Sequence, residues 1–258
     1  IAKGNSNVSM GYPLAASPVY SMIESLFALL ESSSGETCQA DAYIRFVLHP
    51  YVKNIECKNS SEISRIIFHG IEETLARNLT KIITLESIEN SVYAHGKTGI
   101  VDFIFKRLSS HPEIKSADEV RNHIKFIHDS AVRPFEKIDS LGDFADKLLD
   151  LISLISKKST AHLHDNYDMF VQSLIKRLHE LKVSRLAGMK FEANSSYFRL
   201  LRRTLNDASA HFSGTPLKGL QALGFLETRG LKFSHVWFLD ANEGVIPGLG
   251  AQIAGVKA

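Results

Sequence analysis

Six cationic residues near the end of the chain are of the type that binds nucleic-acid phosphates. They are Arg199, Arg202, Arg203, Lys218, Arg229 and Lys232. The first three belong to one expected helix, where residues three or four positions apart share a face. Guanidinium and ammonium groups hold the phosphate backbone through charge and counterion release. The pattern indicates a DNA contact surface, with a solvated basic face as the alternative.

Three aromatic residues are candidates for stacking on nucleic-acid bases: Tyr12, Trp237 and Phe238. Trp237 and Phe238 belong to an apolar run that is expected to form a strand, so at least one of them is expected in the core. Tyr12 lies in a Gly-Tyr-Pro turn and is the better exposed candidate.

Two other groups of residues suggest chemistry less strongly. Gly96-Lys97-Thr98 has the end of a phosphate-binding loop, but Ser91 stands where that loop needs its first glycine, so no ATP site is expected. His162, His164, Asp165 and Asp168 are metal-type ligands, yet histidines two positions apart do not share a helix face. We interpret them as a solvated helix start, and His49 before Pro50 as a packed or capping residue.

The composition is that of a globular protein without a large positive net charge. Lys and Arg number 30 against 28 Asp and Glu, a net charge of +2, so a nucleic-acid contact must come from a local patch. Two cysteines indicate a reducing compartment without a disulfide framework. No apolar run approaches the length of a membrane span, and no signal peptide is recognisable. A cytoplasmic location is therefore expected.

Apolar residues recur at helical spacing through most of the chain, which predicts amphipathic helices. The stripes begin at Val19, Ala42, Ile63, Val120, Phe144, Tyr167 and Tyr197. Ser17 is expected to cap the first helix, with Pro18 at its first position. Asp165 is expected to cap the helix that starts at Tyr167. Beyond the start of the chain, strand signals return only in the C-terminal run.

That C-terminal run, 212–247, reads as a short strand, a polar loop holding Arg229-Gly-Leu231, a strand over His235–Leu239, and a loop ending Glu243-Gly-Val-Ile-Pro247. This order resembles motif V of UvrD/Rep-type superfamily 1 DNA helicases, and more closely the degenerate AddB- or RecC-like helicases that often precede a PD-(D/E)XK nuclease domain. At the other end, Asn7-Val-Ser-Met-Gly-Tyr-Pro-Leu14 resembles the segment that opens their second motor domain.

The sequence departs from the active helicases at polar positions of this motif. Gly224 and Leu226 stand where active enzymes have Thr-x-His. Arg229 replaces a lysine, and Lys232 replaces an acidic residue. Because hydroxyl and imidazole groups that touch phosphate are missing, the resemblance implies an inactivated helicase.

The resemblance implies an α/β fold with a RecA-like, P-loop NTPase-like parallel sheet. Residues 1–40 and 190–258 would form this domain, called 2A, and residues 41–189 a mostly helical insertion, called 2B. No sequence of the nuclease type, with Asp and Glu-x-Lys on adjoining strands, is found in the chain.

The implied function is DNA binding in double-strand-break repair and recombination, without catalytic residues, metal or cofactor. The chain is expected to be a fragment of a helicase/exonuclease protein, with ATP and Mg bound only by parts outside it. Single-stranded or tailed duplex DNA would be its partner. One alternative is a scaffold that holds a catalytic helicase–nuclease subunit. Others are an active helicase with its nucleotide motifs upstream, and an unrelated α/β protein whose loop mimics motif V.

Overall fold

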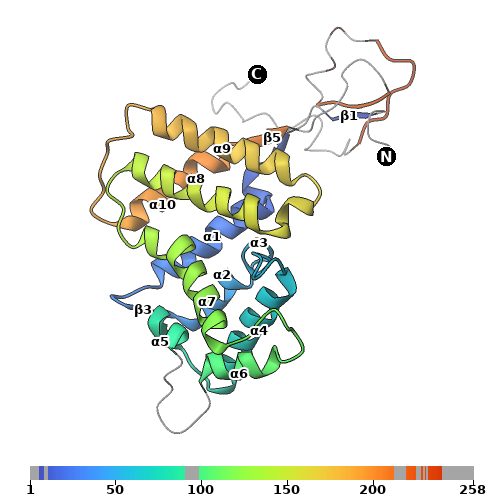
Figure 1. Cartoon of the computed structure of the whole chain (residues 1–258). Helices are drawn as coiled ribbons and strands as arrows, with labels where there is room; N and C mark the ends of the chain where they lie inside the picture. The colour runs from blue at the N-terminus through green and yellow to red at the C-terminus, as the bar shows by residue number, and fades with distance from the viewer. Residues whose placement is uncertain are drawn as a thin grey trace.

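The computed structural model describes residues 6–8, 11–90, 99–211, 219–224, 228, 230 and 232–239. Ten α-helices and six three-residue strands occur in these ranges. Figure 1 shows α8, α9 and α10 together in the upper part of the helical body and α4 and α6 at its lower end. One continuous hydrophobic core runs through both parts, from Leu14 to Ala210.

The helices follow the amphipathic stripes of the sequence. Their bounds are α1 Pro18–Glu31, α2 Ala40–Val47, α3 Pro50–Lys53, α4 Ser61–Arg77, α5 Leu85–Asn90, α6 Ile100–Arg107, α7 Ala117–Ala131, α8 Leu141–Lys158, α9 Tyr167–Val183 and α10 Asn194–Asn206. The expected cap of α1 is confirmed: the Ser17 side chain accepts a hydrogen bond from the Tyr20 N–H at 3.3 Å, and Pro18 is the first helical residue.

The expected cap of α9 is wrong. The N-cap of α9 is Asn166, which has a left-handed backbone with φ of 62° and makes no side-chain capping bond. Asparagine tolerates this conformation better than most residues, so the turn before α9 places the cap one position later than Asp165.

Six strands pair into three two-stranded ladders. β1 (Ser6–Val8) pairs in parallel with β6 (Leu220–Ala222). β2 (Gly11–Pro13) pairs antiparallel with β5 (Ser209–His211), and β3 (Thr37–Gln39) antiparallel with β4 (Ile82–Thr84). The β2–β5 approach is close, because a Cβ on Gly11 would lie 2.6 Å from Ser209 Oγ. The first two ladders thus join the start of the chain to residues 209–211 and 220–222.

The expected RecA-like parallel sheet is wrong. Within the described ranges, the single parallel ladder is β1–β6, and every sheet has two strands. The apolar stripes between the two ends have the helical period, so each helix buries one face against other helices rather than against a sheet. The strands β3 and β4 were not expected either, since three residues are too few to show alternation. The division into 1–40 with 190–258 and 41–189 stays a prediction.

The strand expected over His235–Leu239 is also absent from the structure. Residues 232–239 form no strand, and Trp237 and Phe238 are 87% and 64% exposed. The expectation that at least one of these two rings is in the core is therefore wrong. A strand needs a hydrogen-bonded neighbour, and none of the described strands pairs with this segment. In the same described ranges, none of the helices combines the length and hydropathy that crossing a membrane requires.

Candidate functional site

The three arginines of α10 lie on different sides of that helix. The buried face of α10 consists of Tyr197, Phe198, Leu201 and Leu205. Phe198 stacks on Phe27 of α1 with ring centroids 4.3 Å apart. This packing fixes the rotation of α10, so Arg199 and Arg203 are exposed and lie one helical turn apart.

Arg202 is held by carboxylates of α1. Its Nε lies 3.0 Å from Glu24 Oε1, and its Nη1 lies 2.8 Å from Glu31 Oε1. The guanidinium carbon also lies 5.4 Å from the centre of the Phe27 ring. The hydrogen bond to Glu31, followed by the contacts with Glu24, raises the pKa of Arg202. This side chain joins α10 to α1, and its predicted phosphate contact would have to compete with two carboxylates.

The other predicted DNA-binding residues are only partly placed. Lys218 and Arg229 lie outside the described residues, as does Gly96-Lys97-Thr98. Lys232 is exposed. Tyr12 is 38% exposed, with its ring 5.3 Å from that of Phe170 of α9. The structure therefore brings Arg199 and Arg203 together, whereas Arg229 and Leu231 of the motif V loop lie outside the described residues.

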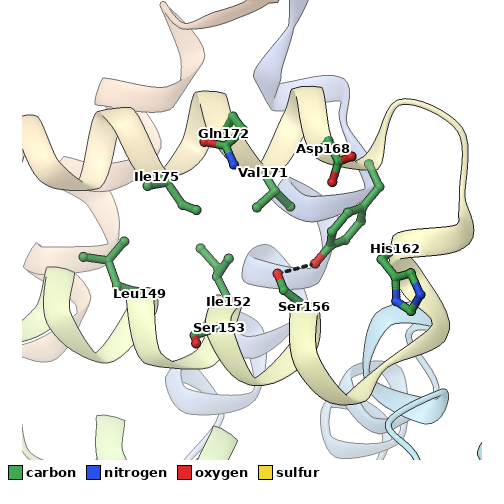
Figure 2. A pocket seen from close by; sticks show the side chains of 10 residues that line it. Leu149, Ile152, Ser153, Ser156, His162, Asp168, Val171, Gln172 and Ile175 are labelled. Carbon is green, nitrogen blue, oxygen red and sulfur yellow. Dashed lines mark hydrogen bonds between the residues drawn. The ribbon is translucent and has the colours of Figure 1, made fainter.

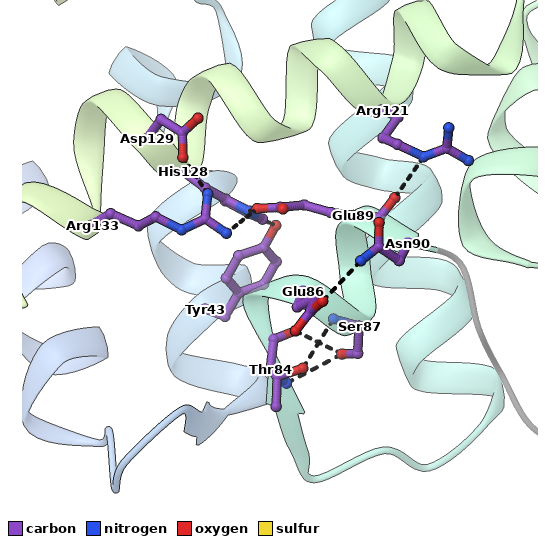
Figure 3. Close-up of polar contacts among 10 residues, drawn as sticks. All are labelled: Tyr43, Thr84, Glu86, Ser87, Glu89, Asn90, Arg121, His128, Asp129 and Arg133. Atoms are coloured by element: carbon purple, nitrogen blue, oxygen red, sulfur yellow. Dashed lines mark hydrogen bonds and ion pairs between the residues drawn. The ribbon is translucent and has the colours of Figure 1, made fainter.

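A buried polar network, absent from the sequence-based predictions, connects α2, α5 and α7 (Figure 3). His128 is fully buried, with Nδ1 2.6 Å from Glu89 Oε1 and Nε2 2.9 Å from the Tyr43 hydroxyl. Arg133 Nη2 donates to the same Glu89 oxygen at 2.6 Å, and its Nη1 reaches Asp129. Tyr43, Glu89 and His128 are far apart in sequence, so no spacing signal could have revealed their contacts.

The ionisation of the network follows from its contacts. Burial alone raises the pKa of Glu89, but hydrogen bonds from His128 and Arg133 outweigh it, so the pKa lies below its ordinary value. Burial lowers the pKa of His128 despite its bond to Glu89. A neutral His128 therefore donates from Nδ1 to the ionised Glu89 and accepts the Tyr43 proton at Nε2. Tyr43, His128 and Glu89 are buried, so this part of the network supports the fold, while Arg133 and Asp129 extend it to the surface.

Two serine–histidine pairs have the residue types of a nucleophile and a base. Ser64 Oγ lies 2.9 Å from His123 Nε2, but Ser64 is fully buried. His49 Nδ1 accepts the Tyr51 N–H at 3.2 Å, so its Nε2 carries the proton and donates to Ser21 Oγ at 2.9 Å. That tautomer cannot take a proton from Ser21. The expected capping role of His49 at α3 is confirmed.

A groove lies between α8 and α9, beside the residues considered as metal ligands (Figure 2). His162 and Asp168 border it, together with the Ser156 and Tyr167 hydroxyls, which lie 2.8 Å apart. His162 Nδ1 is 2.8 Å from the Ser159 carbonyl oxygen. No group of three or more metal-type ligands converges anywhere in the described part of the chain.

Comparisons with protein-family models, with curated proteins and with solved structures find no match for this chain. The interpretation of the site therefore rests on its own residues and geometry.

Proposed function

We propose that this chain binds DNA through the phosphate backbone, with the exposed cationic face of α10 as the contact surface. We define that face by Arg199 and Arg203. The observation that carries the proposal is that both guanidiniums are exposed and have no ion-pair partner among the described residues.

Charge is concentrated around this face. Residues 185–211 contain five Lys and Arg against two Asp and Glu, a net charge of +3, whereas the whole chain carries +2. Arg185 and Lys190, in the segment before α10, are exposed as well. A local positive surface on an otherwise nearly neutral protein attracts a polyanion and orients it.

The spacing of the two arginines suits a phosphate chain. One helical turn separates their Cα atoms by about 6 Å along the α10 axis. Arginine presents a fixed fork of donors that matches phosphate oxygens. Contacts of this kind position a protein on DNA without reading bases, so binding with little sequence preference follows.

The wider role that we propose is non-catalytic. Within the described residues, each serine–histidine pair is either buried or has a tautomer unsuited to a base, which supports binding rather than chemistry. The resemblance of the two chain ends to AddB- and RecC-like proteins supports a place in double-strand-break repair, next to a catalytic helicase–nuclease partner. Free Cys38 and Cys57 are compatible with the cytoplasm.

The test is a salt titration of binding to fluorescent single-stranded and tailed duplex DNA, read by anisotropy. An Arg199→Ala/Arg203→Ala variant removes two phosphate contacts, so the slope of log K against log salt should fall by about 1.4 for single strands and about 1.8 for duplex. The control is Arg65→Ala/Lys106→Ala, which removes two exposed cations from α4 and α6 at the opposite end of the body (Figure 1). Equal slopes for both variants would reject α10 as the contact surface.

A scaffold role is the second candidate, and exposed apolar side chains favour it. Val183, Leu186 and Met189, around the end of α9, are 81%, 46% and 41% exposed. These residues lie in the predicted insertion. If they hold a partner subunit, Leu186→Asp should abolish co-sedimentation with that subunit and leave DNA affinity unchanged.

A further inference from the structure

The lining of the groove between α8 and α9 changes from apolar at one end to polar at the other. Its volume is about 360 Å³, within the range of small-ligand pockets. Leu149 of α8 and Ile175 of α9 lie at one end, and Ile152 with Val171 at the middle (Figure 2). The other end carries the Asp168 carboxylate. The lining residues recur at helical spacing on both helices, so the groove follows them for about 10 Å.

Polar atoms along this groove have no protein partner. Asp168 makes no hydrogen bond or ion pair with any described residue, and neither do the Ser153 hydroxyl and the Gln172 amide. Ser153 differs in this from serines such as Ser25 and Ser173, which bond back to the carbonyl of the preceding turn. The groove therefore offers free polar groups beside apolar walls.

The free groups are chiefly acceptors. Asp168 is acceptor-only when ionised. His162 donates from Nδ1 to the Ser159 carbonyl, so its Nε2 in the neutral ring is an acceptor too. A ligand that satisfies this end must bring N–H donors and, opposite Asp168, a positive charge. A ligand that fills the rest must bring an unbranched apolar chain.

We propose that the groove binds an aliphatic ammonium ion, with its charged head against Asp168 and its chain along Ile152 and Val171 towards Leu149. Both a free amine and a lysine side chain of a bound peptide have this chemistry. The site is separate from the α10 face and does not depend on its binding DNA.

The test uses n-octylamine, whose length suits the groove, and n-octanoate, which has a similar chain but the opposite charge. Binding is followed by amide ¹H–¹⁵N chemical shifts of the whole chain. We expect octylamine to shift amides of 149–156 and 168–175, with octanoate at least tenfold weaker. An acetylated leucyl-lysine amide forms the second arm, and the tighter of the two cationic probes identifies the source.

Two variants complete the experiment. Asp168→Asn removes the charge that faces the groove and should weaken octylamine binding about tenfold. Asp150→Asn removes an exposed carboxylate of α8 that does not line the groove, and should leave binding unchanged. The proposal is overturned if octylamine does not bind, if octanoate binds equally well, or if the two variants behave alike.

Discussion

His123 should make the stability of this protein depend on pH in a way that one substitution can isolate. Its side chain is 7% exposed in α7, and its Nε2 lies 2.9 Å from Ser64 Oγ. Burial, with a smaller contribution from the nearby Lys158 cation, lowers the pKa of His123 to about 4. Lys158 Nζ lies over the Phe126 ring of α7, 5.2 Å from its centre.

The sign of the effect follows from the lowered pKa. An unfolded histidine gains its proton below pH of about 6.5, whereas folded His123 stays neutral until about pH 4. Protons therefore favour the unfolded chain between these values. The stability that neutral His123 provides is complete above pH of about 6.5 and is lost as the pH falls towards 4. Linkage places the loss between pH 7 and pH 5 at about 2 kcal/mol.

The variant His123→Gln tests this number. Glutamine retains an amide that can bond Ser64 but does not titrate. Urea unfolding at pH 7 and pH 5 should show that the wild type loses about 2 kcal/mol more than the variant on acidification. His49 and His128, whose pKa values are also lowered, remain in both proteins and cancel in the comparison.

A surface exchange serves as the control. His179→Gln, at an exposed position of α9, should leave the pH dependence of the wild type intact. If His123→Gln and the wild type lose the same free energy between pH 7 and pH 5, His123 is not held neutral by the fold, and the reasoning from its burial fails.

Three further outcomes are expected. Glu89→Leu should lower the free energy of unfolding by about 1–3 kcal/mol in urea, because the buried Nδ1–H of His128 loses its acceptor. Gly70→Ala should lower the free energy of unfolding by about 1–3 kcal/mol, since the new Cβ would lie 2.7 Å from Ile104 Cγ1. In an Ile104→Ala background the same change should raise the free energy of unfolding. A change of the same sign in both backgrounds would contradict the packing argument. Arg202→Ala should lower the melting temperature measurably more than Arg199→Ala, because Arg202 bridges two helices; equal melting temperatures would refute that role.

The helices could be predicted from the sequence because their signal is local. The stripes of α4, α7 and α8 repeat with the helical period, and that period alone determines the buried face. The sheet was predicted from a resemblance at the two ends, and the structure contradicts it. An apolar run such as Phe233–Leu239 shows β propensity but not whether a neighbouring strand exists.

The polar contacts could be predicted from the sequence only in part. Spacing placed two of the three arginines on a shared face, but the carboxylates of α1 that hold Arg202 are far away in sequence. The Tyr43–His128–Glu89 network likewise joins three separate segments. Pairings of this kind depend on tertiary packing, so a single sequence without the fold carries no signal for them.

The β2–β5 ladder has a consequence for how the helical body is connected. Pro13 and Ser209 are partners in that ladder, so the chain enters and leaves the body at adjacent backbones. Residues 14–208 therefore form one long insertion whose first and last residues lie side by side. In a shortened chain, a tight hairpin turn between β2 and β5 can replace this insertion. The ladder is also packed on the body, because the Tyr12 ring lies against Phe170 of α9 and Ala210 belongs to the hydrophobic core, so the two connections are held in one orientation.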